Sequence, residues 1–218
     1  MNLQLELYKF QREFRKKFPS EKVAILQAAT QTLARDFQNR RPLRVEDKAP
    51  DFVLSNTSGQ SICLSEQLNQ GAVLLNFYFG HWCPYCNLEL RAYQGLLAKI
   101  QALESSILAI SPQTADASQK TALKNAITFD LLSDNNCQIA QDYGIAFEVP
   151  DALRPLYAEL GHALPDYNGT EDWLLPVPAT FIIDRRGHVA LAYINVDYTQ
   201  RYEPTDAIAI LLSLFVAT

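Results

Sequence analysis

The sequence predicts a mixed α/β fold, in which a central sheet carries helices on both faces. Three observations predict this class. An apolar, aromatic-rich run of strand length at residues 73–79 leads into a helical pattern that begins at Pro84. Two more strand-like segments, each followed by a helical one, lie between residues 106 and 143. A strand hairpin and a final helix follow. Repeated strand–helix units that end in a hairpin are typical of a mixed sheet covered on both faces.

The first 44 residues differ from the rest in charge. They hold ten lysines and arginines against four acidic residues, a net charge of +6, whereas the remainder holds nine against twenty, a net charge of −11. We therefore divide the 218 residues into an N-terminal helical extension, residues 1–44, and one domain, residues 45–218. The basic extension fits either a solvated helical face or a segment that docks on an acidic surface.

Two helices are predicted in the extension, over residues 3–18 and 20–38, with a break at Pro19. Each helix carries an apolar stripe. The stripes are Leu3, Leu7, Phe10, Phe14 and Phe18 on the first helix, and Val23, Ala24, Leu26, Ala28, Leu33 and Phe37 on the second. Such stripes have to be covered, either by the domain of the same chain or by another subunit. A homodimer is therefore one arrangement that the sequence allows.

The chain shows no targeting or membrane signal. Its start lacks the apolar stretch of a secretory signal, and the apolar run at residues 207–217 is too short to span a bilayer. The sequence therefore predicts a cytoplasmic protein with no membrane partner. Binding to nucleic acid is not expected either, because the acidic domain lacks a basic, aromatic face.

The domain begins with a hairpin and a short helix. Two strands, 52–54 and 61–64, flank a turn at 56–59 that contains Asn, Ser and Gly. Cys63 is expected to pack inside this region, since a free cysteine behaves as a small apolar residue. A short helix then ends near Gly71.

The second half of the domain contains one unusual stretch. Residues 145–172 are predicted to be irregular, with a short helix at 151–160 and a loop at 166–169, as is typical of a lid or binding loop. The remaining strands are predicted at 106–110, 127–132, 177–184 and 188–194, and the remaining helices at 114–125, 135–143 and 205–215.

The chemistry is expected at the turn after the strand 73–79. A glycine and His81 end the strand, and Pro84 suits the first turn of a helix, where its missing N–H costs nothing. Cys83 is thus placed at the helix N-terminus, where the helix dipole and free N–H groups favour the thiolate and lower the pKa of its thiol. Cys86, one turn further on, lies on the same face and within reach of a disulfide. The pair is interpreted as a redox dithiol.

Metal binding is the alternative use of such a Cys-x-x-Cys pair. The other two cysteines, Cys63 and Cys137, have no cysteine or histidine close in sequence, so a zinc site would need ligands from far-separated residues. Cys137, near the start of a predicted helix, is interpreted as structural. The sequence therefore predicts no metal and no cofactor.

Three segments together resemble the thioredoxin superfamily and, within it, the peroxiredoxin-like proteins of the alkyl hydroperoxide reductase/thiol-specific antioxidant (AhpC/TSA) group. They are Ala-Pro-Asp-Phe at 49–52 with Leu54 and Gly59, Trp-Cys-Pro-Tyr-Cys at 82–86 with the strand before it, and Pro-x-Thr-Phe-x-x-Asp at 178–184. The resemblance covers residues 46 to about 215. It implies a thioredoxin-like fold for this part of the chain.

The resemblance also assigns a role to Pro178. It implies that Pro178 is a cis-proline that faces the dithiol and exposes the backbone of Val177 to an extended thiol substrate. The alternative is an ordinary proline at the start of a strand.

The chain departs from typical peroxiredoxins at the positions that hold the peroxide. Gly80 and Asn76 stand where the signature of the family has threonine and proline. Phe79 and the pair Pro178–Ala179 stand where arginines are expected. If the protein binds a peroxide, the stabilising groups must therefore come from other positions.

Candidates for those groups lie elsewhere in the chain. Arg91 and Arg154 are cations whose place the sequence does not fix.

Related reductases carry a buried acid where this chain has Phe77. Either water or Glu89 would have to replace that acid, and Glu89 is expected to be an exposed helix residue.

Cys83 is expected to be the attacking residue, because it stands first at the helix end and Trp82 keeps one side of it apolar. It would attack either the O–O bond of a peroxide, giving a sulfenic acid, or a substrate disulfide, giving a mixed disulfide. Cys86 would then close a disulfide with it. His81 would either stabilise the thiolate or relay a proton, or be a plain turn residue. The supporting residues of the candidate site are Trp82, His81, Pro84, Tyr85, Val177 and Pro178.

Three functions compete. The first is a peroxiredoxin-like antioxidant enzyme that reduces peroxides, and the second is a general thiol–disulfide oxidoreductase, similar to thioredoxin or glutaredoxin, that acts on protein or glutathione disulfides. The third is a non-enzymatic redox sensor. For either enzyme, thioredoxin, glutaredoxin or glutathione would be the reductant that recycles the disulfide. Peroxide turnover would identify the first function, insulin reduction the second, and a conformational change without turnover the third.

Overall fold

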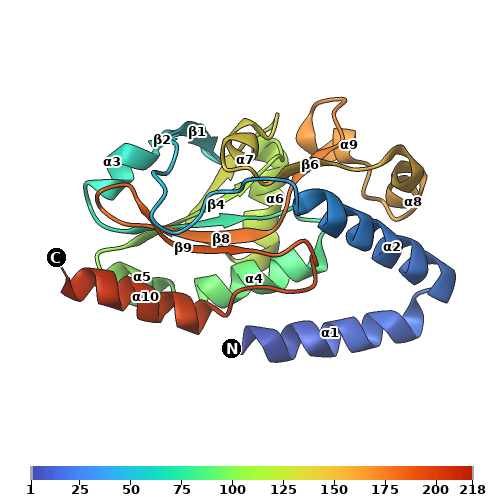
Figure 1. Ribbon diagram of the computed structural model, residues 1–218, viewed down its shortest axis with the longest axis horizontal. Helices are drawn as coiled ribbons and strands as arrows, with labels where there is room; N and C mark the ends of the chain where they lie inside the picture. The colour runs from blue at the N-terminus through green and yellow to red at the C-terminus, as the bar shows by residue number, and fades with distance from the viewer. Residues whose placement is uncertain (1, 218) are drawn as a thin grey trace.

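A seven-stranded mixed sheet forms the centre of the structure, a computed structural model that describes residues 2–217 (Figure 1). Its strand order is β2-β1-β5-β4-β3-β8-β9, with β3, β4 and β5 parallel and the other pairs antiparallel. The strands are β1 (Val53–Asn56), β2 (Ser61–Cys63), β3 (Val73–Phe77), β4 (Ser106–Ser111), β5 (Asp130–Ser133), β8 (Ala179–Ile183) and β9 (Val189–Ile194). The predicted mixed α/β class is confirmed.

Helices cover both faces of this sheet because its central strand buries both sets of side chains. In β3, Val73, Leu75 and Phe77 pack toward α3 (Leu64–Leu68) and α7 (Gln138–Asp142). Leu74 points the other way, toward α5 (Leu97–Ala102) and α10 (Pro204–Val216). The alternation follows from the two-residue period of a strand. The helices α4 (Pro84–Gln94) and α6 (Ala115–Asn125) complete the layers.

No helix within residues 2–217 is both long enough and apolar enough to cross a membrane.

The apolar pattern after Pro84 is divided between two helices. The helix α4 ends at Gln94, and Gly95 and Leu96 separate it from α5. Glycine is a weak helix former, so a pattern that continues past it does not require one unbroken helix.

The segment 145–172 has more regular structure than predicted. The strand β6 (Ala146–Glu148) pairs with β7 (Leu174–Pro176) in a second, two-stranded sheet. Between them lie η1 (Asp151–Leu153), α8 (Arg154–Glu159) and α9 (Leu164–Asn168). The prediction of a loop at 166–169 is wrong, because Pro165 lies in the first turn of a helix that Leu164 anchors in the core.

The two predicted N-terminal helices are present as α1 (Leu3–Lys17) and α2 (Ser20–Phe37), which we call the N-terminal hairpin (Figure 1). Leu3 and Leu7 are buried in the same apolar cluster as the dithiol. Glu203, just before α10, accepts hydrogen bonds from the N–H groups of Leu3 and Gln4 at 3.2 and 3.1 Å. The start of the stripe on α1 is therefore covered by the domain of the same chain.

Candidate active site

The dithiol lies where the chain leaves β3 and enters α4. Cys83 is the N-cap residue of α4, and its Sγ accepts the backbone N–H of Cys86 at 3.3 Å. Pro84 lies in the first turn, as predicted. Gly80 has φ +155°, and a Cβ placed there would lie 2.8 Å from Nε1 of Trp82. The turn thus needs glycine at the position where the peroxiredoxin signature has threonine.

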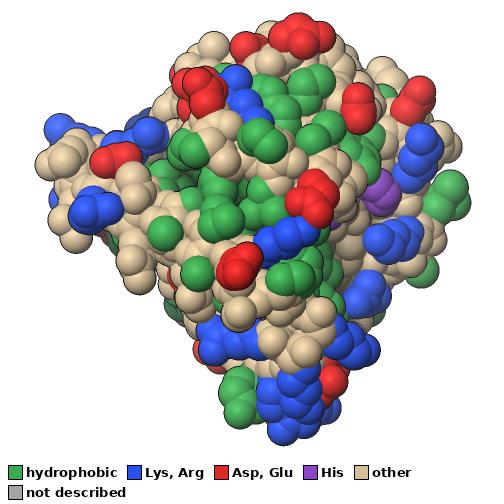
Figure 2. All heavy atoms as spheres, turned by 90° about the vertical axis from the view of Figure 1, so that its right-hand side faces the viewer, with side chains coloured by type: hydrophobic (Ala, Val, Ile, Leu, Met, Phe, Trp, Pro, Cys, Tyr) green, Lys and Arg blue, Asp and Glu red, His purple; other side chains and the backbone are tan. Residues whose placement is uncertain are grey.

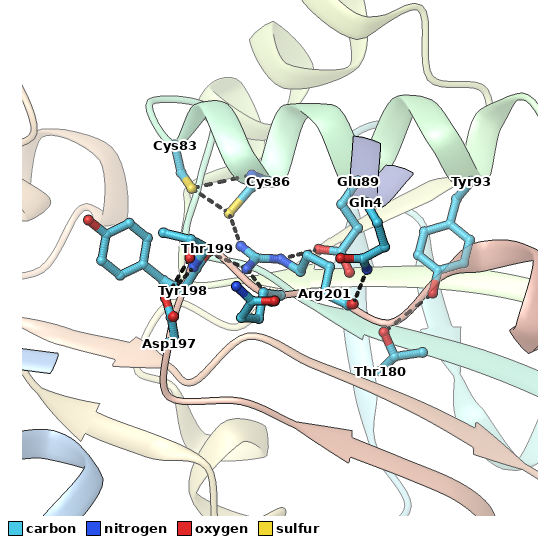
Figure 3. A network of polar contacts seen from close by, with 11 residues as sticks. Gln4, Cys83, Cys86, Glu89, Tyr93, Thr180, Asp197, Tyr198, Thr199 and Arg201 are labelled. Atoms are coloured by element: carbon cyan, nitrogen blue, oxygen red, sulfur yellow. Dashed lines mark hydrogen bonds and ion pairs between the residues drawn. The ribbon is translucent and has the colours of Figure 1, made fainter. Parts of the chain in front are cut away.

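The two thiols are reduced and adjacent (Figure 3). Their Sγ atoms lie 2.7 Å apart, with Cys83 at 2% and Cys86 at 0% exposure. Nη2 of Arg201 donates a hydrogen bond to Sγ of Cys86 at 3.5 Å. The pair is therefore placed for disulfide formation and lies beside a buried cation.

Arg201 lies in the loop between β9 and α10 and is 3% exposed. Its Nε donates to Oε2 of Glu89 at 2.7 Å, and its Nη1 donates to the carbonyl of Gln200 at 2.8 Å and to that of Tyr198. This arginine was not among the residues predicted from the sequence, because it stands in no motif and in a segment to which no element was assigned.

The expectation that Glu89 is exposed is wrong: it is 1% exposed and forms a buried ion pair with Arg201. Residues three apart share one face of a helix, so Glu89 follows Cys86 onto the inner face of α4. That spacing was the signal in the sequence that would have placed Glu89 beside the dithiol.

Electrostatics distinguish the two sulfurs. Burial opposes a thiolate on Cys86, but the hydrogen bond with Cys83 and the charge of Arg201 outweigh it and lower the pKa of Cys86 to about 6. Burial, together with the neighbouring Cys86, raises the pKa of Cys83 well above its usual value. The lowered pKa that the sequence predicted for Cys83 is thus found at Cys86, because the hydrogen bond with Cys83 and the charge of Arg201 both stabilise a thiolate on that sulfur. Two thiols this close hold a single negative charge between them.

Burial also acts on the acid of the ion pair. It raises the pKa of Glu89 to about 7, and the charge of Arg201 only partly offsets this effect.

Cys83, unlike Cys86, lines a pocket of about 360 Å³. Among the described residues that line it, none is charged. They are Phe14, Phe18, Leu26, Phe79, Trp82, Cys83, Pro84, Tyr85, Tyr157, Leu160, His162 and Tyr198. Burial and the neighbouring His81 lower the pKa of His162, which favours its neutral form. Figure 2, which faces the right-hand side of Figure 1, shows apolar side chains gathered in the middle of that face, with a few charged side chains among them and most lysines and arginines toward the edges.

Aromatic contacts hold the residues around Cys83. Trp82 stacks on His162 and on Phe79, with ring centroids 4.8 and 5.7 Å apart. Tyr85 makes edge contacts with Phe10 of α1 and with Tyr198, at 5.1 and 5.6 Å. Trp82 and Tyr85 are thus both parts of the pocket wall, on either side of the first thiol.

His81 lies apart from this group. Its ring is beside Tyr167, at 5.3 Å between centroids, and its Nδ1 has no hydrogen-bond partner within the described part of the chain. Burial, with Lys124 and Lys120 nearby, lowers the pKa of His81 and so disfavours an imidazolium. These surroundings favour the interpretation of His81 as a turn residue.

The role inferred for Val177 and Pro178 is not found. No cis peptide bond occurs within residues 2–217, so the bond before Pro178 is trans. Val177 is fully buried, and its N–H donates to the carbonyl of Ile145 at 2.7 Å. This backbone follows directly on β7 and is used in pairing with the segment next to β6, which leaves its N–H closed to a substrate. Pro178 instead lines a smaller hollow of about 170 Å³.

The two arginines considered from the sequence have other partners. Arg91 donates to Oδ1 of Asn125 at 2.7 Å, and Arg154 forms ion pairs with Glu148 and Asp151 at 2.7 and 2.8 Å. Arg201 takes the position beside the dithiol.

The remaining cysteines lie away from the dithiol. Cys137 is fully buried, in agreement with a structural role. Cys63 is only partly buried, with its Sγ 3.1 Å from Oγ of Ser65, so the expectation that it packs inside is wrong. It lies at the end of β2, an edge strand of the sheet, where side chains are not covered by a neighbouring strand.

Two adjacent thiols at a strand-to-helix turn, on a sheet with this strand order, define a thiol-dependent oxidoreductase with a thioredoxin-like fold. The chain belongs to the AhpC/TSA family, whose sequence model matches residues 45–192.

Curated relatives carry two kinds of name. The chain is 28% identical over 154 residues to a putative peroxiredoxin bcp of Helicobacter pylori, which covers 71% of this chain and 90% of that protein. It is 27% identical over 154 residues to the thiol-disulfide oxidoreductase ResA of Geobacillus thermodenitrificans, covering 70% of this chain and 71% of that protein. Among solved structures, peroxidoxin BcpB of Mycobacterium tuberculosis superposes with a TM-score of 0.62 at 22% identity, over 79% of this chain and 98% of the other. That last likeness supports the fold.

Proposed function

We propose that this protein is a thiol peroxidase in which Cys83 attacks a hydroperoxide and Cys86 closes the resulting disulfide. One observation carries the proposal. Cys83 lies in the wall of an uncharged, apolar pocket, 2.7 Å from a second thiol that Arg201 stabilises as a thiolate. The first sulfur therefore borders the space that a substrate would fill, and the second carries the charge.

The proposed reaction begins with transfer of the shared proton from Cys83 to Cys86. The Cys83 thiolate attacks the terminal oxygen of the hydroperoxide, an S–O bond forms, and the O–O bond breaks. The leaving alkoxide takes the proton of Cys86 and departs as an alcohol. Cys83 is then a sulfenic acid and Cys86 a thiolate beside Arg201.

The second step closes the disulfide. The Cys86 thiolate attacks Sγ of Cys83, and hydroxide leaves. A dithiol, or two molecules of a monothiol such as glutathione, then supplies two electrons and two protons to restore both thiols. Thioredoxin, glutaredoxin or glutathione would fill this role.

The pocket favours a peroxide over the disulfides considered from the sequence. A disulfide on a folded protein would have to reach Cys83 beneath the N-terminal hairpin and α8, which cover it. Glutathione disulfide carries several charges, and the described lining of the pocket offers none to pair with them. The similarity to ResA favours thiol–disulfide exchange as the second candidate function. The redox sensor remains the third.

We also propose a reducing compartment, the cytoplasm, as the place of action. A disulfide between Cys83 and Cys86 has to be reduced again after each turnover, and a compartment that keeps thiols reduced supplies the reductant.

The deciding experiment is stopped-flow mixing of the reduced protein with hydroperoxides, followed by the fluorescence of Trp82. A second-order rate constant at least about 100-fold above that of a free thiol would support peroxidase chemistry. A rate no better than a free thiol, together with rapid insulin reduction, would move the assignment to disulfide exchange.

Replacement of each sulfur tests the assigned roles. We expect Cys83→Ser to abolish the reaction, and Cys86→Ser to react once and stop as a Cys83 sulfenic acid that mass spectrometry detects as a gain of one oxygen. If Cys86→Ser were inert in a single turnover and Cys83→Ser were oxidised, the roles would be reversed.

A further inference from the structure

The pocket wall opposite the dithiol is built by residues that precede the family match at 45–192. Phe14 and Phe18 of α1 stack on each other with centroids 4.4 Å apart, and Leu26 of α2 stands beside them. The N-terminal hairpin thus supplies three apolar side chains to the space into which Cys83 faces.

The size of the pocket exceeds what hydrogen peroxide needs. A water molecule takes about 30 Å³ in the liquid, so two bonded oxygens need roughly 60 Å³. The pocket has about 360 Å³, within the range of sites that bind small organic molecules. Most of its volume therefore lies beyond the two reacting oxygen atoms.

The inner side of α2 faces hollows around Leu26, although its end packs on the core through Leu33 and Phe37. None of the described residues 20–37 is fully buried, although the helix has an apolar stripe. Leu26 lines three neighbouring hollows, all of which also include Tyr198. An ion pair between Lys22 and Glu159 of α8 ties the start of α2 across the pocket. Leu33 and Phe37, later in the stripe, pack against the core, whereas Leu26 is left facing open space beside a reactive thiol.

We propose that the N-terminal hairpin makes the enzyme selective for hydroperoxides that carry a bulky apolar group, with Phe14, Phe18 and Leu26 as specificity-determining residues. The apolar group would lie against these side chains while the peroxide reaches Sγ of Cys83. This inference rests on the proposed peroxidase function and adds the part of the chain that selects the substrate.

The test compares cumene hydroperoxide with hydrogen peroxide as substrates of the full chain. Leu26→Gln keeps the length of the side chain but places a polar group in the wall. Ile25→Gln is the matched control, because Ile25 is the neighbouring residue on the outer side of α2 and is 46% exposed. Phe18→Ala is the second wall variant. Far-ultraviolet circular dichroism of each variant monitors the helices.

For the unaltered chain, we expect the second-order rate constant for cumene hydroperoxide to exceed that for hydrogen peroxide by about tenfold or more. Leu26→Gln and Phe18→Ala should lower the first constant about five- to tenfold and leave the second within about twofold. Ile25→Gln should change neither.

Two results would overturn the inference. Equal losses with both substrates in the wall variants would mean that the hairpin supports the fold and not the selection, while the peroxidase function stands. If the unaltered chain reacts with neither hydroperoxide faster than a free thiol, the proposed function itself fails, and the selectivity fails with it.

Discussion

The two sides of the dithiol offer opposite environments. On the side of Cys83 lies a pocket without a charged wall, closed by the N-terminal hairpin and α8. On the side of Cys86 lies the buried ion pair of Arg201 and Glu89, whose atoms approach to 2.7 Å. The sulfurs themselves are 2.7 Å apart, so one proton transfer links the two environments.

Under the proposed function, this difference would let the site react with a peroxide without the arginine that typical peroxiredoxins use to hold it. In typical relatives the cation faces the substrate, whereas here it lies behind the second sulfur. An apolar substrate then meets no buried charge that it would have to desolvate. The thiolate is still stabilised, because the charge of Arg201 acts across the pair. Cys83 is thus the sulfur that borders the substrate pocket, and Cys86 is the sulfur that lies beside the stabilising charge of Arg201.

Removal of the cation should have the largest effect. We expect Arg201→Ala to raise the first pKa of the dithiol from about 6 toward the ordinary value of 9. At pH 7 the thiolate fraction, and with it the rate of peroxide reaction, would fall by up to about 100-fold, and by less where the remaining hydrogen bond with Cys83 keeps the pKa below 9. Most of this loss should be recovered when the rate is measured near pH 9. A loss that persists at high pH would show that Arg201 does more than stabilise charge.

The same variant should be less stable. Without Arg201, Glu89 is left as a buried acid without its partner, which costs about 3 kcal/mol in the free energy of unfolding. Denaturant unfolding measures this cost. Arg201→Lys, which keeps the charge but not the several N–H donors, serves as the control and should retain most of the thiolate and part of the stability.

Glu89→Gln should act in the opposite direction and more weakly. The carboxylate competes with the thiolate for the charge of Arg201, so its removal should lower the dithiol pKa by about one unit. The ultraviolet absorbance of the thiolate, followed against pH, measures the midpoint. A midpoint that does not move, or moves upward, would show that Glu89 is not coupled to the sulfurs.

The stability of this variant should also depend differently on pH. The pKa of Glu89 is raised from 4.5 to about 7, so its contribution to the free energy of unfolding is present below pH 4.5 and lost as the pH rises through 7. The Cys86 thiolate acts in the other sense, because its pKa is lowered: its contribution is present above pH 9 and lost as the pH falls through 6. Between pH 5 and 8 the unaltered protein should therefore lose up to about 3 kcal/mol relative to Glu89→Gln.

The position of the thiols could be predicted from local sequence, whereas their environment could not. A strand, a turn with glycine, and Pro84 at the start of a helix place Cys83 within a dozen residues, and local periodicity is enough to show it. The mixed sheet follows in the same way from the order of its strands and helices. The N-terminal helices were also predicted, since their apolar stripes are regular.

Arg201 could not be predicted, because its place beside Cys86 depends on the path of a loop 115 residues further along the chain. A lone arginine in a loop is usually solvated, and no short-range pattern marks the one that is buried. The backbone at Val177 was misjudged for a related reason. Its pairing with Ile145 belongs to a second sheet whose strands have three residues each, too few to show a period.

Replacement of His81 should have the smallest effect on the peroxide rate, because His81 lies neither in the pocket wall beside Cys83 nor beside Arg201. Its ring lies against Tyr167, and its backbone carbonyl accepts a hydrogen bond from Nδ2 of Asn87 at 2.8 Å. His81→Ala keeps that backbone contact, so we expect the peroxide rate to stay within about twofold at every pH and the dithiol midpoint to stay near 6. The matched comparison is His162→Ala, which removes a ring stacked on Trp82 in the pocket wall and should weaken the reaction with apolar hydroperoxides. If His81→Ala instead lowered the rate tenfold or more, or moved the midpoint upward, the imidazole would be acting on the thiolate. The pocket beside Cys83 and the cation beside Cys86 would then not be enough to explain the reactivity of the dithiol.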